Sequence, residues 1–162
     1  LGLLEICPIF CYNLLMAEAV VSTEIPQVRD VALLKVHPGM ETTARGLFQA
    51  IKKANQKALV LLGYASGATP TILDPLIREF TEQGISVFVL SNNPGENKGI
   101  QTIKYGPQRD SITAGAIPLS NVNVNNAEEV LLTIQAEIDE GKTGRELNEA
   151  VIAKFGTPMP TK

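Results

Sequence analysis

The chain has little of the chemistry from which most sites are built. Its 162 residues include no tryptophan, one histidine (His37), two cysteines (Cys7 and Cys11) and 5% aromatic residues. Few aromatic platforms are therefore available for stacking the bases of single-stranded nucleic acid. One histidine and two cysteines are too few for a four-ligand zinc site within one chain, and we expect two buried thiols in a reducing compartment. The net charge of −3 argues against a nucleic-acid partner.

A long hydrophobic run is also missing. Residues 1–29 are apolar, but their longest charge-free stretch, residues 6–17, has 12 residues, whereas a transmembrane helix needs about 20. A secretory signal begins with basic residues, and the first 21 residues carry only two glutamates. We therefore expect no membrane partner, a cytoplasmic location, and an apolar linker or interface segment at 1–29.

From residue 30 onward, short apolar runs alternate with amphipathic stretches. The runs that predict strands are residues 31–36, 58–62, 85–90 and 116–119. Strands buried on both faces and separated by helices indicate right-handed parallel βαβ units. The sequence therefore predicts an α/β domain over residues 30–156, followed by a tail at 157–162. We expect a three-layer αβα arrangement with a small, mostly parallel four-stranded sheet, flavodoxin-like or Rossmann-like.

Four helices are predicted from apolar residues spaced at i, i+3, i+4 and i+7. Their stripes are Ala44, Leu47, Phe48, Ile51 and Ala54; Leu73, Leu76, Ile77 and Phe80; Val130, Leu131, Ile134 and Ile138; and Leu147, Val151, Ile152 and Phe155. Thr69 is expected to cap the second helix, with Pro70 at its first position. Thr143 and Glu146 have the spacing of a capping box, and residues 101–105 are expected to form a short strand.

In such folds, ligands bind beyond the carboxyl ends of the strands, so the candidate surface consists of the loops at 37–39, 63–69 and 91–99. The loop at 63–69 leads into a helix, whose N-terminus favours anions. Its sequence is not Gly-x-Gly-x-x-Gly, and no lysine follows as in a phosphate loop. Tight packing of strand against helix is the simpler interpretation, and we expect no nucleotide cofactor.

The individual residues that could act in catalysis lack the neighbouring groups or motifs that would activate them. His37 has no nucleophile or orienting acid among its sequence neighbours. Ser66 and Ser91 follow strands, but neither stands in a Gly-x-Ser-x-Gly frame. The asparagines at 121–126 are typical of turn and cap chemistry. Composition and spacing therefore indicate no catalytic constellation, metal site or cofactor.

The order of four segments does match a known pattern. Residues 31–39 form a strand with a Pro-Gly turn, residues 57–70 a strand with a Gly-rich loop, and residues 84–91 a strand with a polar end. Tyr105 and the Ala-Gly-Ala-Ile-Pro run at 114–118 follow. Over roughly residues 30–140, this order resembles the C-terminal domain of the bacterial-type L-asparaginase/glutaminase family.

The resemblance implies hydrolysis of asparagine, and sometimes glutamine, to the acid and ammonia. In the family, threonine nucleophiles activated by a lysine and an aspartate lie on an N-terminal domain with Thr-Gly-Gly-Thr and His-Gly-Thr-Asp motifs. Neither motif occurs in these 162 residues, which begin at Leu1 and not at methionine. The resemblance thus implies that the catalytic domain is a missing partner and that this chain carries no catalytic residue. It also implies a homodimer or tetramer in which the domain completes a neighbouring subunit's active site for a small amide.

The chain departs from the family pattern at polar positions. Ala68 stands where the family has a substrate-holding asparagine, and Leu62 and Asn93 stand where allosteric members have an arginine and a cysteine. Residues 121–123 replace an Asp-Met-Thr motif, and Gln108 replaces a glycine. The residues that would form the substrate or effector loop are Tyr64, Ser66, Ala68, Thr69, Ser91, Asn92 and Asn93. The alternatives are a non-catalytic small-molecule-binding or assembly module with a flavodoxin-like fold, and a self-contained enzyme.

Overall fold

A single parallel sheet forms the centre of the computed structural model, which describes residues 28–95 and 99–158. Its strands are β1 (Val31–Lys35), β2 (Ala58–Leu62), β3 (Ser86–Ser91) and β4 (Ile117–Asn123). They lie in the order β1-β2-β3-β4, and every neighbouring pair is parallel. The predicted four-stranded sheet is confirmed.

The burial of each strand follows from its place in that order. All residues of the two central strands, β2 and β3, are buried, as their apolar runs predicted. β1 lies at the edge of the order, and its buried and exposed residues alternate, with Leu33 45% exposed. Between β3 and β4 the register shifts after the Val89–Pro118 pair, so strand pairing is irregular at the edge of the sheet formed by β4.

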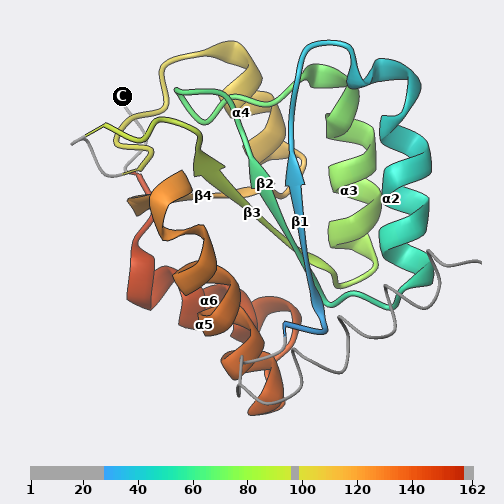
Figure 1. Ribbon diagram of the computed structural model, residues 1–162, viewed down its shortest axis with the longest axis vertical. Helices are drawn as coiled ribbons and strands as arrows, with labels where there is room; N and C mark the ends of the chain where they lie inside the picture. The colour runs from blue at the N-terminus through green and yellow to red at the C-terminus, as the bar shows by residue number, and fades with distance from the viewer. Residues whose placement is uncertain (1–27, 96–98, 159–162) are drawn as a thin grey trace, which may run out of the picture.

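Helices cover both faces of the sheet. They are α2 (Ala44–Lys53), α3 (Asp74–Glu82), α4 (Gly106–Thr113), α5 (Ala127–Asp139) and α6 (Gly144–Phe155), with short 3₁₀ helices η1 (Met40–Thr42), η2 (Thr71–Leu73) and η3 (Val124–Asn126). Figure 1 shows α2, α3 and α4 on one face of the sheet and α5 and α6 on the other. This arrangement confirms the three-layer α/β fold. Within the described residues, no helix combines the length and apolar character that a membrane span requires.

Two hydrophobic cores fill the spaces between these layers. In the first, alternate residues of β2 and β3 pack against α2 and α3, and the Phe48 and Phe80 rings lie 4.6 Å apart, centroid to centroid. In the second, the other faces of the same strands, including Phe88, pack against Ile134 of α5 and Leu147 of α6. Each fully buried side chain of this size contributes roughly 1.5–3 kcal/mol to folding.

The consecutive strand order explains why one layer contains three helices. Going from β1 to β4, each new strand is added to the same edge of the sheet. Because every crossover between these parallel strands is right-handed, the connecting helices α2, α3 and α4 lie on one face of the sheet. The order does not reverse anywhere in the described sheet. Doubly wound folds bind ligands in the crevice that such a reversal opens, and this sheet offers no crevice of that kind.

Several local predictions are wrong. Residues 101–105 form no strand, because the amides of Lys104 and Tyr105 bond to the Gln108 side chain and not to a neighbouring strand. Thr143 precedes α6 but makes no capping hydrogen bond, since Gly144 has φ 50° and the first turn is not regular there. In α2, Leu47 is 38% exposed, so it faces solvent and not the core.

Candidate functional site

The loops that follow β2 and β3 lie against each other at the carboxyl edge of the sheet. The amide of Gly63 donates to the Leu90 carbonyl at 2.9 Å, and the amide of Asn92 donates to the Tyr64 carbonyl at 3.3 Å. Val36, just after β1, donates to the Leu62 carbonyl at 3.0 Å. The structure therefore brings the seven candidate residues into two adjoining segments, as parallel strands with a shared carboxyl edge require.

The Gly-rich loop is a tight turn held by its own backbone. Tyr64 donates to the Ala68 carbonyl and Gly67 donates to the Tyr64 carbonyl, each at 2.8 Å, while the Ala68 amide donates to Ser66 Oγ at 3.3 Å. Gly67 has φ 77°, and a Cβ there would lie 2.2 Å from Cδ1 of Ile100. The positive φ and the close approach of the Ile100 side chain account for a glycine at this position.

The two serines use their hydroxyls within the loops. Ser91 is 1% exposed; its Oγ donates to the Ala65 carbonyl at 2.6 Å and accepts the Asn93 amide at 3.1 Å. Ser66 Oγ accepts the amide of Ala68. In the part of the chain that the structure describes, neither hydroxyl bonds to a side chain that could take its proton. A serine nucleophile needs such a base, so these hydroxyls brace the loops.

Thr69 does not cap a helix. The chain forms the 3₁₀ helix η2 first, and α3 begins only at Asp74, with Pro75 in its first turn. Both Pro70 and Pro75 suit a helix start, and the later one is used. Thr69 is left 1% exposed, and within residues 28–95 and 99–158 its Oγ1 has no hydrogen-bond partner. The predicted N-cap is therefore wrong.

The other candidates have mixed surroundings. Ala68 is a buried methyl group, and the half-buried Tyr64 ring packs against the first core. Asn93 is exposed, and its Oδ1 accepts the Gly95 amide at 3.1 Å. The side chains of Asn92 and Tyr64 are partly exposed, and with the Asn93 side chain they offer amide and phenol groups for contacts outside the loops.

A third segment, after β4, joins this edge through asparagine side chains. Asn123 is 3% exposed; its Oδ1 accepts the Asn125 amide at 2.9 Å, and its Nδ2 donates to the Gly95 carbonyl at 3.5 Å. Asn125 Nδ2 donates to the Pro94 carbonyl at 3.1 Å. These asparagines make the turn and cap contacts that the sequence indicated, and they also tie the β3 loop to β4.

Gln108 is the residue that sequence reasoning missed. It is 2% exposed, and its Oε1 accepts the amides of Lys104 and Tyr105 at 2.9 Å each. Its Nε2 donates to the Ser66 carbonyl at 2.5 Å, so one side chain connects α4 to the Gly-rich loop. The only signal in the sequence was that a glutamine stands where the resembled family has a glycine.

The titratable group near this edge is a carboxyl at the start of α3. Burial raises the pKa of Asp74, the nearby carboxylate of Asp110 raises it further, and Arg78 opposes both.

Among the described residues, no three histidine, cysteine, aspartate or glutamate side chains are grouped to hold a metal ion. Cys7 and Cys11 lie outside the described residues, and His37 is exposed in the turn after β1. The edge thus offers backbone, amide, phenol and imidazole groups to a ligand.

Comparison with known proteins places this fold. No protein-family profile matches the chain, and no curated protein matches it. Solved structures that match it include L-asparaginase I from Vibrio cholerae (TM-score 0.62, 16% identity, 78% of this chain and 36% of that one) and the thermostable L-asparaginase from Thermococcus kodakarensis (TM-score 0.60, 20% identity, 82% and 38%). They also include the "probable cytoplasmic L-asparaginase" from Campylobacter jejuni (TM-score 0.52, 16% identity, 76% and 34%).

The chain spans only 34–38% of the length of these structures. At sequence identities of 16–20%, the similarity shows a shared fold and says nothing about a shared activity. The resemblance found in the sequence is confirmed at that level, and the chain has the fold of one part of an L-asparaginase.

Proposed function

We propose that this chain is the C-terminal α/β domain of an asparaginase-like amidohydrolase, which as a whole enzyme converts asparagine to aspartate and ammonia. The observation that carries the proposal is the shared fold with three L-asparaginases, each of them nearly three times as long as the matched region. A chain that corresponds to one part of such an enzyme needs the remainder, here an N-terminal catalytic domain, for turnover.

In this proposal, the chain contributes the edge of an active site and not its nucleophile. Amide hydrolysis through a hydroxyl nucleophile needs a base in hydrogen-bond reach. The hydroxyls of Ser66 and Ser91 are bonded to the loop backbone, which suits residues that shape a site. We assign to the joined loops the role of substrate or effector loop that completes a neighbouring subunit's site. Its residues are Tyr64, Ser66, Ala68, Thr69, Ser91, Asn92 and Asn93.

Assembly and location are part of the same proposal. A homodimer or tetramer would cover apolar surface, and the chain exposes Leu33 on β1 and Ile72 on η2 to 45% and 44%. Residues 1–29 would serve as a linker or an interface segment beside the domain at 30–156. A cytoplasmic location is supported by the description of the Campylobacter jejuni neighbour as cytoplasmic.

Ammonia release tests the proposal. The purified 162-residue chain should release no ammonia from asparagine or glutamine above a buffer blank, while a complete L-asparaginase run beside it should do so. Turnover that stays with the chain through purification and is lost in Ser66→Ala or Ser91→Ala would contradict the proposed division of labour. Circular dichroism of each serine variant shows whether it is still folded, so a loss of activity can be told apart from a loss of folding.

The alternative is a non-catalytic small-molecule-binding or assembly module. Loops whose hydroxyls are engaged in their own structure also suit such a module. Reading the gene upstream of the Leu1 codon separates the two. An in-frame Thr-Gly-Gly-Thr and His-Gly-Thr-Asp would support the amidohydrolase, and ammonia release by the longer protein would complete the test. A start codon beside Leu1, with no such motifs, would favour the module.

A further inference from the structure

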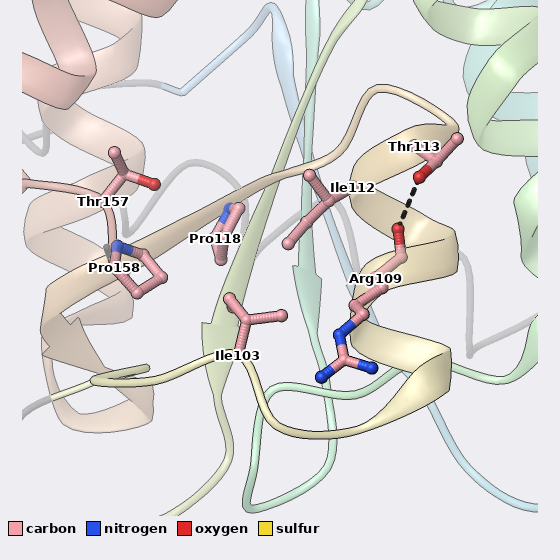
Figure 2. Close-up of a pocket in the computed structure, with 7 residues that line it drawn as sticks. All are labelled: Ile103, Arg109, Ile112, Thr113, Pro118, Thr157 and Pro158. Atoms are coloured by element: carbon pink, nitrogen blue, oxygen red, sulfur yellow. Dashed lines mark hydrogen bonds between the residues drawn. The ribbon is translucent and has the colours of Figure 1, made fainter. Parts of the chain in front are cut away.

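A hollow outside the candidate loops lies between α4, the start of β4 and the chain that follows α6. Figure 2 shows the seven residues that line it: Ile103, Arg109, Ile112, Thr113, Pro118, Thr157 and Pro158. Its volume is about 430 Å³. Small-molecule sites in proteins have volumes of about 300–1,000 Å³. The hollow therefore has the size of a ligand site, and none of its residues belongs to the candidate loops.

The wall of this hollow is apolar. Ile103 comes from the segment before α4, Ile112 from α4, Pro118 from β4 and Pro158 from the chain after α6, and their side chains face the same space in Figure 2. Ile112 remains 37% exposed. A second space behind Ile103 and Ile112 has no room for a water molecule, so packed protein supports the wall. Ile103, Pro118 and Pro158 are buried, so an apolar group placed here would contact all four side chains and would remove mainly the exposed carbon surface of Ile112 from water.

Arg109 supplies charge at the side of this wall. Its Nη2 donates to the Lys104 carbonyl at 3.4 Å, and its own carbonyl accepts Thr113 Oγ1 at 2.8 Å. In the described part of the chain, the ion pairs involve other cations, and no carboxylate pairs with Arg109. A guanidinium has five donors in a planar fork that fits a carboxylate with two parallel bonds. Arg109 thus has unused donors suited to an anion.

We propose that this hollow binds a small aliphatic carboxylate. The carboxylate would lie on the Arg109 guanidinium, and the hydrocarbon chain would cover Ile103, Ile112 and the two prolines. This occupant satisfies both halves of the site at once. A neutral apolar molecule would leave the exposed Arg109 guanidinium to water, and acetate would leave the wall uncovered. The proposal is independent of the amidohydrolase function, since it involves none of the loops assigned to that function.

Titration of the 162-residue chain with hexanoate, followed by amide chemical shifts, tests the proposal. We expect saturable binding with a Kd of about 1–10 mM, as suits a ligand of this size, and shifts at Ile103, Ile112 and Thr113. Hexan-1-ol keeps the hydrocarbon chain and should bind about 3-fold more weakly, because the pair with the exposed Arg109 is lost. Acetate keeps the charge and should bind about 10-fold more weakly, because it covers little of the wall. No saturable change with hexanoate, or shifts confined to other parts of the chain, would overturn the proposal.

Two variants separate the charge from the wall. Arg109→Gln should weaken hexanoate binding about 3-fold and leave hexan-1-ol binding unchanged. The matched control, Arg45→Gln, removes the same charge from an exposed position on α2 and should leave hexanoate binding unchanged. Ile112→Ala should weaken hexanoate and hexan-1-ol alike, by about 3-fold. Equal hexanoate affinity in Arg109→Gln and the parent chain would refute the assignment.

Discussion

Replacing Gln108 with leucine tests whether one side chain holds the Gly-rich loop to α4. In the parent chain, Gln108 accepts the amides of Lys104 and Tyr105 and donates to the carbonyls of Ser66 and Thr102. Leucine has a similar volume and no hydrogen-bonding groups. The cavity and strain terms are therefore small, and the lost hydrogen bonds dominate the change in stability.

The expected magnitude follows from what each lost partner can do next. A buried group that loses its only partner costs about 1–3 kcal/mol. Lys104 and Tyr105 are exposed residues, so their amides can turn to water, whereas the Ser66 carbonyl loses its 2.5 Å bond inside the loop. We expect Gln108→Leu to lower the free energy of unfolding by about 1–3 kcal/mol, a large part of the roughly 5–15 kcal/mol typical of a domain.

Urea denaturation measures this loss, and amide hydrogen exchange locates it. Exchange at Gly67 and Ala68 should speed up, because these amides bond within the turn that Gln108 holds. Gln49→Leu, at an exposed position of α2, is the matched control and should change stability by less than about 0.5 kcal/mol. A loss below about 1 kcal/mol for Gln108→Leu, with unchanged exchange at Gly67 and Ala68, would refute the reasoning.

Gln108→Glu divides the effect into its two halves. The carboxylate can still accept the amides of Lys104 and Tyr105, and it lies in the first turn of α4, where the helix dipole favours negative charge. It cannot donate to the Ser66 carbonyl. Exchange at Lys104 and Tyr105 should therefore stay slow, while Ala68 exchanges faster.

Two further predictions concern Gly67 and Asp74. Gly67→Ala should lower the free energy of unfolding by at least about 2 kcal/mol, because of its φ of 77° and the contact with Ile100; Gly46→Ala, where a Cβ meets nothing within 4 Å, should raise it by up to about 1 kcal/mol, both read by urea denaturation. Because the pKa of Asp74 is raised by burial and by Asp110, the folded chain keeps that proton to higher pH, and stability falls as pH rises through the folded pKa. Asp74→Asn should therefore gain on the parent chain as pH rises from below 3.8 to 7, and a pH-independent difference would contradict this.

Strands and helices could be predicted from the sequence where the spacing of apolar residues alone determines which side chains are buried. Residues 58–62 are five consecutive apolar residues, and all five are buried in β2 with the predicted bounds. Phe80 and its stripe on α3 are buried as predicted, since a helix with one apolar face has one way to pack on a sheet. These elements depend on spacing alone, which a single sequence contains.

The remainder depends on contacts between distant residues. Gln108 bonds to Ser66, 42 positions away, and no local pattern encodes that pair. The same bonds withdraw the amides of Lys104 and Tyr105 from any strand, and the Gly-Pro pair that opens α4 is typical of a turn. The positions of the candidate loops followed from the strand ends. The engagement of the Ser91 hydroxyl did not, because its partner Ala65 lies 26 residues away.

The consecutive order of the strands has a consequence for synthesis on the ribosome. Each of β2, β3 and β4 can pair with the strand synthesised just before it as soon as it leaves the ribosome, and α2, α3 and α4 cover one face as the sheet grows. Among the described residues, the helices that cover the other face, with Phe88 and Leu90, are α5 and α6, which begin at residues 127 and 144. A nascent chain paused before that point displays a bare apolar sheet face, which is the kind of surface that chaperones hold until translation supplies its cover.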